Sequence, residues 1–421
     1  MSAPEMISMG CRLNIAESET LRQNLLASNI DGDNLIIVNS CAVTNEAVRQ
    51  TRQAIRRAKK ANPEKNIIVT GCAAQVDPAM FAAMPETSAV VGNGDKYDVA
   101  NFKLGLQSNR PDIRVSDIMR ITETTPHMVS AFADRSRAFV EIQNGCDHRC
   151  TFCIIPFGRG NSRSVPAGLV VDQVQALVDQ GFQEVVLTGV DVTSYGPDLP
   201  GEPTLGMLIE RILKLVPALP RLRLSSLDGI EIDDRLLDLL TGEARLMPHV
   251  HLSLQSGDNM ILKRMKRRHN REQAIDLVER LKTRRPEIAI GADIIAGFPT
   301  EDEAMFANSR SIIEQCDIVH GHIFPYSPKQ GTPAAKMPQV DGQVIKDRAK
   351  ILRALVEKRA QSWRQSLVGS RQSILAEMSG DAGYSEGFAR IQLDEPVSKG
   401  QIVPVDIIAI NDKKLIGRVA A

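Results

Sequence analysis

The sequence predicts an α/β protein in three parts: a small open α/β domain, a partial (β/α)6 barrel and a small antiparallel β-barrel. Short apolar runs alternate with helical patterns through the first two parts, which indicates parallel sheets covered by helices. Six strand–helix units follow residue 136, which suits a partial barrel better than a full eight-stranded one. The last segment holds short β-prone runs separated by glycine and turn residues, a pattern typical of a small barrel.

The first domain, residues 1–95, contains continuous apolar runs of the kind that form buried parallel strands. These runs span 35–38, 67–69 and 88–91, after a short apolar start at 6–9. Helical patterns at 47–61 and 78–84 separate them. Residues 96–135 are polar and weakly patterned, so we expect a connector with room for one strand.

The second part, residues 136–366, repeats the order strand then helix. The predicted strands are 137–143, 183–188, 221–225, 249–254, 288–294 and 318–324. The predicted helices are 169–180, 204–215, 232–240, 271–284, 301–315 and 342–366. The third part, residues 367–421, is predicted to be the small β-barrel.

Three thiols stand at C-x3-C-x2-C spacing directly after the first predicted barrel strand: Cys146, Cys150 and Cys153. Three is an odd number for disulfide pairing and one ligand short of a tetrahedral zinc site. The same number suits a 4Fe-4S cluster that keeps one iron open to a further ligand. The loop therefore predicts both a cofactor and a binding position on it.

A second group of thiols is spread through the first domain. Cys41 and Cys72 each follow a predicted parallel strand, and Cys11 follows the short apolar start. Because the carboxyl ends of parallel strands meet along one edge of a sheet, the three thiols are expected to converge there. The alternative is that they are three small buried residues, but their repeated placement at strand ends favours a second three-thiolate cluster. Cys316 stands alone in an apolar stretch and is predicted to lie in the core.

Polar motifs also follow the later barrel strands. They supply five candidate binding residues: Gly189, Asp191, Ser225, Gln255 and Gly297. The loops at the carboxyl ends of barrel strands form the rim of the active site in this class of fold. These residues are therefore expected to share the rim with the cysteine loop.

The charge of the chain shows where on the sequence a charged partner could bind, although it does not identify that partner. The 421 residues include 51 basic and 51 acidic ones, so the whole chain carries no excess positive charge for nucleic acid. Two local patches remain: residues 45–65 hold seven Lys and Arg against two Glu, and residues 258–285 hold ten against four acidic residues. Two such patches favour a phosphate-rich partner. No secretory signal or membrane-spanning run is seen, which predicts a cytoplasmic protein.

The cysteine motif at the first strand of a partial barrel resembles the radical S-adenosylmethionine enzymes. Three further stretches, 10–14, 38–44 and 70–75, narrow the resemblance to the methylthiotransferases. Within that family, 189–196 and 322–328 are most similar to the tRNA enzymes that act on threonylcarbamoyladenosine beside the anticodon. Sibling branches modify isopentenyladenosine in tRNA or an aspartate of a ribosomal protein.

The resemblance implies a fold, cofactors and partners. The parts would be a flavodoxin-like domain, a radical-SAM partial barrel and a TRAM-like β-barrel. Cys146, Cys150 and Cys153 would hold one 4Fe-4S cluster whose open iron binds S-adenosylmethionine, while Cys11, Cys41 and Cys72 would hold an auxiliary 4Fe-4S cluster. The reaction would convert C–H to C–S–CH3 at adenine carbon 2, with two S-adenosylmethionine molecules. The implied partners are the tRNA anticodon stem-loop, an electron donor such as flavodoxin or ferredoxin, and a sulfur donor, with no membrane.

The sequence departs from the family at Val165, where members usually carry Arg. A phosphate or cofactor contact by that guanidinium is therefore in doubt, and Arg159 and Arg163 are the candidates to replace it. Two other classes of function remain as alternatives. His148 could complete a Cys3His zinc site in a nucleic-acid-binding module without catalysis, although this leaves the strand-end thiols unused. A thiol redox enzyme is disfavoured because no isolated Cys-x-x-Cys pair stands on a thioredoxin-like unit.

Overall fold

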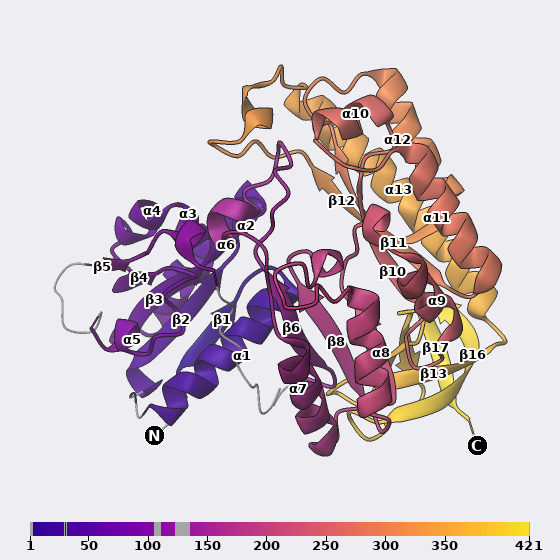
Figure 1. Ribbon diagram of the computed structural model, residues 1–421, viewed down its shortest axis with the longest axis horizontal. Coiled ribbons are helices and arrows are strands. Elements are labelled where there is room, and N and C mark those ends of the chain that lie inside the picture. The colour runs from indigo at the N-terminus through magenta and orange to yellow at the C-terminus, as the bar shows by residue number, and fades with distance from the viewer. Residues whose placement is uncertain (1–2, 29, 31, 105–110, 123–134, 421) are drawn as a thin grey trace.

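The first domain is an open parallel sheet with helices on both faces (Figure 1). The computed structural model describes residues 3–28, 30, 32–104, 111–122 and 135–420. The strands pair in chain order, all parallel: β1 (Glu5–Ser8), β2 (Leu35–Ser40), β3 (Asn66–Gly71), β4 (Ala89–Val91) and β5 (Asp112–Arg114). The helices are α1 (Arg12–Ala27), α2 (Asn45–Ala61), α3 (Cys72–Val76), α4 (Pro78–Ala82) and α5 (Ala100–Leu104). Apolar residues of α1 and α5 pack on one face of the sheet, and those of α2 and α4 on the other.

Helix α1 was not expected from the sequence pattern, and it connects the first domain to the barrel. Leu21 and Leu25 pack on the first sheet, whereas Ala16 belongs to the core of the barrel. A helix buried on two sides does not show the single apolar stripe of a surface helix. Figure 1 shows α1 between β1 and β6, where it joins the two layers.

The central part is a partial parallel barrel, as predicted. Its strands form a four-stranded sheet in the order β7-β6-β8-β9 and a three-stranded sheet in the order β10-β11-β12. The bounds are β6 (Ala138–Asn144), β7 (Arg163–Ser164), β8 (Glu184–Gly189), β9 (Arg221–Leu224), β10 (His249–Gln255), β11 (Ala289–Ala296) and β12 (Ile318–Pro325). Isolated parallel bridges such as Leu227 to Leu252 link β9 to β10. Within the described residues β12 pairs only with β11, so the barrel is open between β12 and β6.

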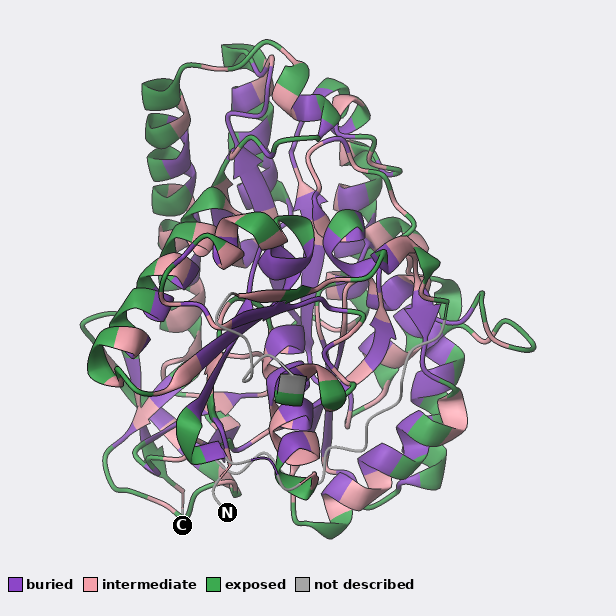
Figure 2. Ribbon diagram, turned by 90° about the vertical axis from the view of Figure 1, so that its left-hand side faces the viewer, coloured by how far each residue is buried: buried purple, intermediate pink, exposed green. Residues whose placement is uncertain are grey.

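Helices cover the outer face of the barrel strands. They are α7 (Ala167–Asp179), α8 (Leu205–Leu215), α9 (Asp234–Gly242), α11 (Arg271–Arg284), α12 (Glu303–Gln315) and α13 (Gly342–Leu367). Two short helices, α6 (Ile155–Arg159) and α10 (Asn259–Arg264), follow the cysteine loop and β10 instead. Figure 2 shows the strands buried and the outward faces of the helices exposed. The six predicted strands and six predicted helices of this part all occur, and Cys316 lies in the core as expected. Among the described residues, no helix has the length and apolar character needed to cross a membrane.

The third part is a closed barrel of five strands, β13 (Arg371–Ala376), β14 (Ala382–Ser385), β15 (Arg390–Leu393), β16 (Ile402–Asn411) and β17 (Lys414–Val419). Four of its strand pairs are antiparallel, as predicted, but β15 and β17 run parallel. A closed ring with an odd number of strands cannot alternate direction throughout, so one parallel pair is unavoidable.

The predicted connector, residues 96–135, contains the strand β5, which joins the first sheet as its edge strand.

Candidate active site

The cysteine loop begins where β6 ends, and a glycine makes that turn possible. Gly145 has φ +74°, and a Cβ at this position would collide with the carbonyl oxygen of Asn161. Further along, the Thr151 backbone N–H donates to the carbonyl of Met265 at 3.1 Å, and its hydroxyl donates to the carbonyl of Arg264 at 2.8 Å. The loop is therefore held at both ends, on its own strand and on the segment after α10.

The three thiols of this loop lie in one partly buried environment. Burial raises the pKa of Cys153 to about 12; the backbone N–H of Ile155 opposes the shift, and the charge of Cys150 adds to it. The pKa of Cys146 is raised by burial and by the nearby charge of Asp191, with Cys153 and Cys150 contributing. Each thiol thus lies within electrostatic range of the others. A bound metal centre would displace these protons, because a coordinating thiol is deprotonated.

The three strand-end thiols also converge, as the sequence predicted. Cys11 follows β1, Cys41 follows β2 and Cys72 begins α3 directly after β3. Burial raises the pKa of Cys41 to about 11; the backbone N–H of Val43 opposes the shift, and the charges of Cys72 and Cys11 add to it. A Cβ on Gly10 would lie 2.8 Å from Sγ of Cys41, so only glycine allows this approach of the β1 loop. Because β1, β2 and β3 are parallel neighbours in the sheet, the three thiols that follow them lie along the same edge of it.

The buried guanidinium of Arg159 lies beside the second thiol set. Its Nε–H donates to Sγ of Cys72 at 3.1 Å, and its Nη2 donates to Oδ1 of Asn14 at 2.6 Å. The same guanidinium pairs with Glu17 through contacts of 2.7 and 3.0 Å. Burial alone would raise the pKa of Glu17, but the charges of Arg159 and Lys96 lower it below its usual range. Arg159 is therefore held in a fixed, charge-paired position against a thiol.

The segment after the cysteine loop packs against the second thiol set, because α6 contacts α3. Helix α6 follows Cys153 by two residues, and α3 begins with Cys72. A Cβ on Gly158 would lie 3.3 Å from Cβ of Cys72, so the two backbones come close together. Asn93 bridges them, since its Nδ2 donates to the carbonyl of Gly158 at 2.5 Å and lies 3.7 Å from Sγ of Cys72. The first domain and the barrel therefore adjoin at their thiol-bearing loops, and Cys72 lies within electrostatic range of Cys153.

A loop after β12 also contacts the first domain. The side-chain amide of Asn45 donates to the carbonyl of Pro328 at 3.2 Å, and Nζ of Lys329 donates to Oδ1 of Asn45 at 3.0 Å. Asn45 starts α2, four residues after Cys41. The contact therefore connects the end of the 322–328 stretch, singled out in the sequence, to the first domain.

All five predicted rim residues lie at the carboxyl ends of barrel strands. Gly189 ends β8, Ser225 follows β9, Gln255 ends β10 and Gly297 follows β11. Gly189 allows close approach, since a Cβ there would lie 2.6 Å from the carbonyl oxygen of Gln143. Gly297, in contrast, packs tightly on α13, because its Cβ would lie 2.5 Å from Ile345. The Ser225 hydroxyl is buried and has no hydrogen-bond partner among the described residues, so it can still bind a ligand.

Asp191 is paired with His148 of the cysteine loop. Its Oδ2 lies 2.8 Å from Nε2 of His148, and its carboxylate accepts from the hydroxyls of Thr193 and Ser194 at 3.1 Å each. Burial acts to raise the pKa of Asp191, but the hydrogen bond and charge of His148 lower it below its usual range. Asp191 is therefore a fixed anion at the rim, and His148 is bound to a carboxylate.

Sequence reasoning missed two side chains that organise the rim. The amide of Gln143 donates to the carbonyl of Gly145 and accepts from the N–H of Asp191, at 2.8 Å each, which ties the cysteine loop to the end of β8. Arg267 lies 3.7 Å from Sγ of Cys150 and donates to the carbonyl of Ser253 at 2.8 Å. The signal available for Arg267 is its position in the basic run 263–268, from which the sequence predicts only a phosphate-rich partner. The side chain of Arg267 is buried beside the cysteine loop rather than exposed on the surface.

The structure shows where Val165 and the two candidate arginines, Arg159 and Arg163, lie. Val165 is buried in the apolar core, and its carbonyl accepts from the hydroxyl of Tyr195 at 2.7 Å. Arg159 donates a hydrogen bond to Cys72 of the second thiol set. Arg163 donates to the backbone carbonyls of Asn161 and Arg159 at 2.8 and 3.0 Å, so it stabilises the chain after α6.

Comparison with known proteins identifies the family. A family model described as Radical SAM superfamily matches residues 140–311, and a model described as Uncharacterized protein family UPF0004 matches residues 5–92. The threonylcarbamoyladenosine tRNA methylthiotransferase MtaB of Rickettsia prowazekii (strain Madrid E) is 50% identical over 408 residues, which cover 97% of this chain and 95% of the relative. The chain belongs to the radical S-adenosylmethionine methylthiotransferases.

Further relatives of this methylthiotransferase fall into two named groups. The MtaB enzyme of Bacillus subtilis (strain 168) is 34% identical, with 95% of this chain and 92% of the relative covered. The tRNA-2-methylthio-N(6)-dimethylallyladenosine synthase of Roseobacter denitrificans (strain ATCC 33942 / OCh 114) is 31% identical, with 97% of each covered. In fold, the methylthiotransferase is similar to the radical S-adenosylmethionine methyltransferase TsrM from Kitasatospora setae, with a TM-score of 0.52 at 16% identity, covering 77% of this chain and 69% of TsrM.

The residues present fit the cofactors of a radical methylthiotransferase, namely 4Fe-4S clusters and S-adenosylmethionine. Six of the seven cysteines form two sets of three, and each set can leave one iron of a 4Fe-4S cluster open. The alternative of a zinc-binding module without catalysis is wrong for this chain, because the chain belongs to a family of enzymes.

Proposed function

We propose that this methylthiotransferase adds a methylthio group to carbon 2 of threonylcarbamoyladenosine next to the anticodon of tRNA. The observation that carries the substrate is the 50% identity, over nearly the whole length, to an enzyme named for that nucleoside. The tRNA class is common to the relatives described above, whichever nucleoside they are named for. The observation that supports the chemistry is the presence of two sets of three thiols, each at strand ends, in two domains that adjoin one another.

In this proposal Cys146, Cys150 and Cys153 hold the cluster that binds S-adenosylmethionine, and Cys11, Cys41 and Cys72 hold the auxiliary cluster. When bound, these groups supply the one-electron chemistry that carbon 2 requires, since its C–H has no acidic proton. The protein holds the cluster loop through Thr151 and Gln143, and it fixes the second set through Arg159.

The rim residues would bind the methionine end of the cofactor. Gly189 permits close backbone approach, and the carboxylate of Asp191 can accept from an ammonium group once His148 moves aside. Ser225 offers its unpaired hydroxyl, and the side chain of Gln255 lies at the end of β10. Gly297 contributes through packing against α13, which sets the position of the loop after β11.

The proposal also requires partners. The net change from C–H to C–S–CH3 needs a source of sulfur and a source of electrons, so a sulfur donor and a reductant such as flavodoxin or ferredoxin are expected. The anticodon stem-loop would enter from the open side of the barrel between β12 and β6. Exposed cations on α2, including Arg57 and Lys60, are available for its phosphates.

Nucleoside analysis tests the substrate. tRNA from a strain that lacks this protein should accumulate threonylcarbamoyladenosine without its methylthio group, and the normal profile should return when the chain is supplied again. An unchanged threonylcarbamoyladenosine profile, with loss of the methylthio group from isopentenyladenosine, would move the proposal to the substrate class of the second group of relatives.

A further inference from the structure

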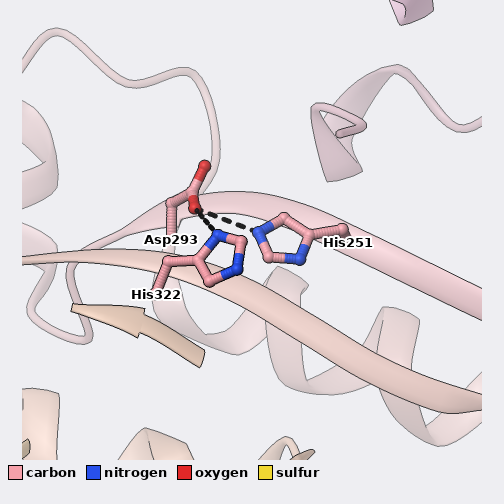
Figure 3. A group of neighbouring side chains, drawn as sticks. All are labelled: His251, Asp293 and His322. Atoms are coloured by element: carbon pink, nitrogen blue, oxygen red, sulfur yellow. Dashed lines mark hydrogen bonds and ion pairs between the residues drawn. The ribbon is translucent and has the colours of Figure 1, made fainter. Parts of the chain in front are cut away.

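Three polar side chains meet on the inner face of the partial barrel, one from each of its last three strands. His251 lies on β10, Asp293 on β11 and His322 on β12. Nε2 of His251 lies 3.0 Å from Oδ1 of Asp293, and Nδ1 of His322 lies 3.2 Å from the same oxygen (Figure 3). The two imidazole rings are 4.6 Å apart between centroids. We call this group the His–Asp–His triad.

The register of the strands explains why the three meet. Asp293 lies directly opposite His322, whereas His251 lies opposite Gly291, two residues before Asp293. A Cβ at position 291 would collide with Nδ1 of His251, so the glycine leaves the space in which the ring leans toward Asp293. The arrangement is built by the backbone rather than by flexible surface side chains.

The triad keeps free polar atoms on its open side. Both histidines point one nitrogen at Oδ1 of Asp293, which leaves Nε2 of His322 and Oδ2 of Asp293 without a hydrogen-bond partner among the described residues. His251 is only 8% exposed, but the side chain of His322 is 64% exposed. Because β12 is the edge strand of the open barrel, a ligand can reach these atoms from outside.

The triad lies between the cysteine loop and the base of the barrel. Two residues after His251, the carbonyl of Ser253 binds Arg267, which lies 3.7 Å from Sγ of Cys150. Two residues of a strand span about 7 Å. In the other direction, His249 contacts the ring of Phe388, which belongs to the C-terminal barrel and closes that end. A nucleoside that offers its base to the cysteine loop would therefore have its substituent near the triad.

We propose that the His–Asp–His triad binds the polar, negatively charged substituent on N6 of the substrate adenine. This inference rests on the proposed function. His322 in its imidazolium form donates through Nδ1 to Asp293 and through Nε2 to the carboxylate of the threonine moiety. Oδ2 of Asp293 accepts from the hydroxyl of that moiety or from a carbamoyl N–H. His251 is a positioning residue, since it acts on the substituent only through Asp293.

The chemistry of the triad separates the two substrate classes found among the relatives. A dimethylallyl group is apolar and would leave the carboxylate and the imidazole in contact with hydrocarbon and without partners. A site built to hydrogen-bond its substrate rejects an analogue that lacks those groups, because its own polar groups are then left unpaired. The triad thus favours threonylcarbamoyladenosine in two ways. It forms hydrogen bonds with that substrate, and it makes unfavourable contacts with dimethylallyladenosine.

Binding of defined RNAs to the reconstituted enzyme tests the inference. The probes are three anticodon stem-loops that differ only at one adenosine: unmodified, threonylcarbamoylated or dimethylallylated. The variants are His322→Ala and Asp293→Asn, with iron content checked for each. The matched control is His320→Gln, on the same strand, where glutamine can keep the hydrogen bond to the carbonyl of Gly387. Kd is measured for each RNA by anaerobic fluorescence anisotropy.

The expected result is that the wild type and His320→Gln prefer the threonylcarbamoylated RNA, while His322→Ala and Asp293→Asn lose about tenfold to a hundredfold of that preference. Equal preference in all four proteins would overturn the inference and leave the proposed function intact. A wild type that neither prefers nor methylthiolates this RNA would contradict the proposed function itself. Stoichiometric zinc that is lost in Asp293→Asn, with the RNA preference unchanged, would overturn the inference in favour of a metal site on the same three donor atoms.

Discussion

Nε of Arg159 lies 3.1 Å from Sγ of Cys72, although 87 residues separate them in the chain. Arg159 ends α6, which follows the cysteine loop of the barrel, while Cys72 belongs to the first domain. The contact therefore joins the segment after the cysteine loop to the second thiol set through one charged hydrogen bond. The guanidinium is in turn held by Glu17 and Asn14 of α1, the helix that packs between the two domains.

Replacing Arg159 with lysine should change the redox potential of a cluster bound by Cys72. Lysine keeps the positive charge beside Glu17 but cannot direct an N–H at the sulfur while it pairs with the carboxylate. Hydrogen bonds to cluster sulfurs stabilise the reduced state, so the midpoint potential of the auxiliary cluster should fall by on the order of 50 mV. EPR-monitored redox titration measures this value.

The matched control for that change is Arg163→Lys, because Arg163 lies four residues after Arg159 and donates to the backbone carbonyls of Asn161 and Arg159. It should leave both potentials within the error of the titration. Equal potentials in Arg159→Lys and the wild type would show that the contact has no influence on the cluster.

Removing one thiol from either set should remove the iron of that set's cluster and leave the other cluster bound. Cys41→Ala should lose about half of the iron and the transfer of the methylthio group, while it keeps reductive cleavage of S-adenosylmethionine. Cys150→Ala should lose the other half together with that cleavage. Iron assay and quantification of 5′-deoxyadenosine check both results. Loss of all iron in either variant would count against two independent clusters.

The carboxyl of Glu301 should make stability depend on pH. Burial raises the pKa of Glu301 to about 7, although Arg348 opposes the shift. The folded state therefore holds the proton more tightly than the unfolded state, and the free energy of unfolding should fall as pH rises from about 4.5 to about 7. Glu301→Gln stays neutral and should lack this fall, a difference on the order of 1 to 3 kcal/mol.

Thermal unfolding of the loaded enzyme and of Glu301→Gln, at pH 5 and pH 8 under anaerobic conditions, measures that difference. Glutamine can still accept from Nη1 of Arg348, which lies 3.0 Å from Oε1 of Glu301. Parallel pH profiles for the two proteins would mean that Glu301 is already ionised at low pH in the folded state.

Phe388 should hold the C-terminal barrel against the base of the central barrel. The ring lies under the guanidinium groups of Arg12, Arg137 and Arg223, at 5.5, 5.4 and 4.8 Å from its centroid. Phe388→Ala removes these contacts and should cost about 2 kcal/mol of stability, whereas Phe388→Tyr keeps the ring. Calorimetry compares the two variants, and equal melting temperatures would contradict the assignment.

The barrel strands were predictable because their pattern is local. The run before Cys146 and the five later runs are apolar and end in polar motifs, so both the strands and the rim could be placed from sequence. Convergence of Cys11, Cys41 and Cys72 followed from the same rule for strand ends. The short elements α10 and β7 carry too few residues to show a period.

The rest could not be predicted because it depends on contacts between distant segments. Arg159 and Glu17 lie 142 residues apart and pair only because α1 packs between the domains. His251, Asp293 and His322 come from three strands, and no spacing in the chain relates them. Helix α1 itself was missed because both of its sides are buried.

The central claim is that this chain converts threonylcarbamoyladenosine in tRNA to its 2-methylthio derivative. The most direct measurement is mass spectrometry of nucleosides after the anaerobically reconstituted enzyme acts on a threonylcarbamoylated anticodon stem-loop, with S-adenosylmethionine, reductant and a sulfur source. The expected result is a methylthiolated nucleoside that depends on both Cys41 and Cys150. An unmodified nucleoside, from enzyme that carries both clusters and cleaves S-adenosylmethionine, would contradict the claim.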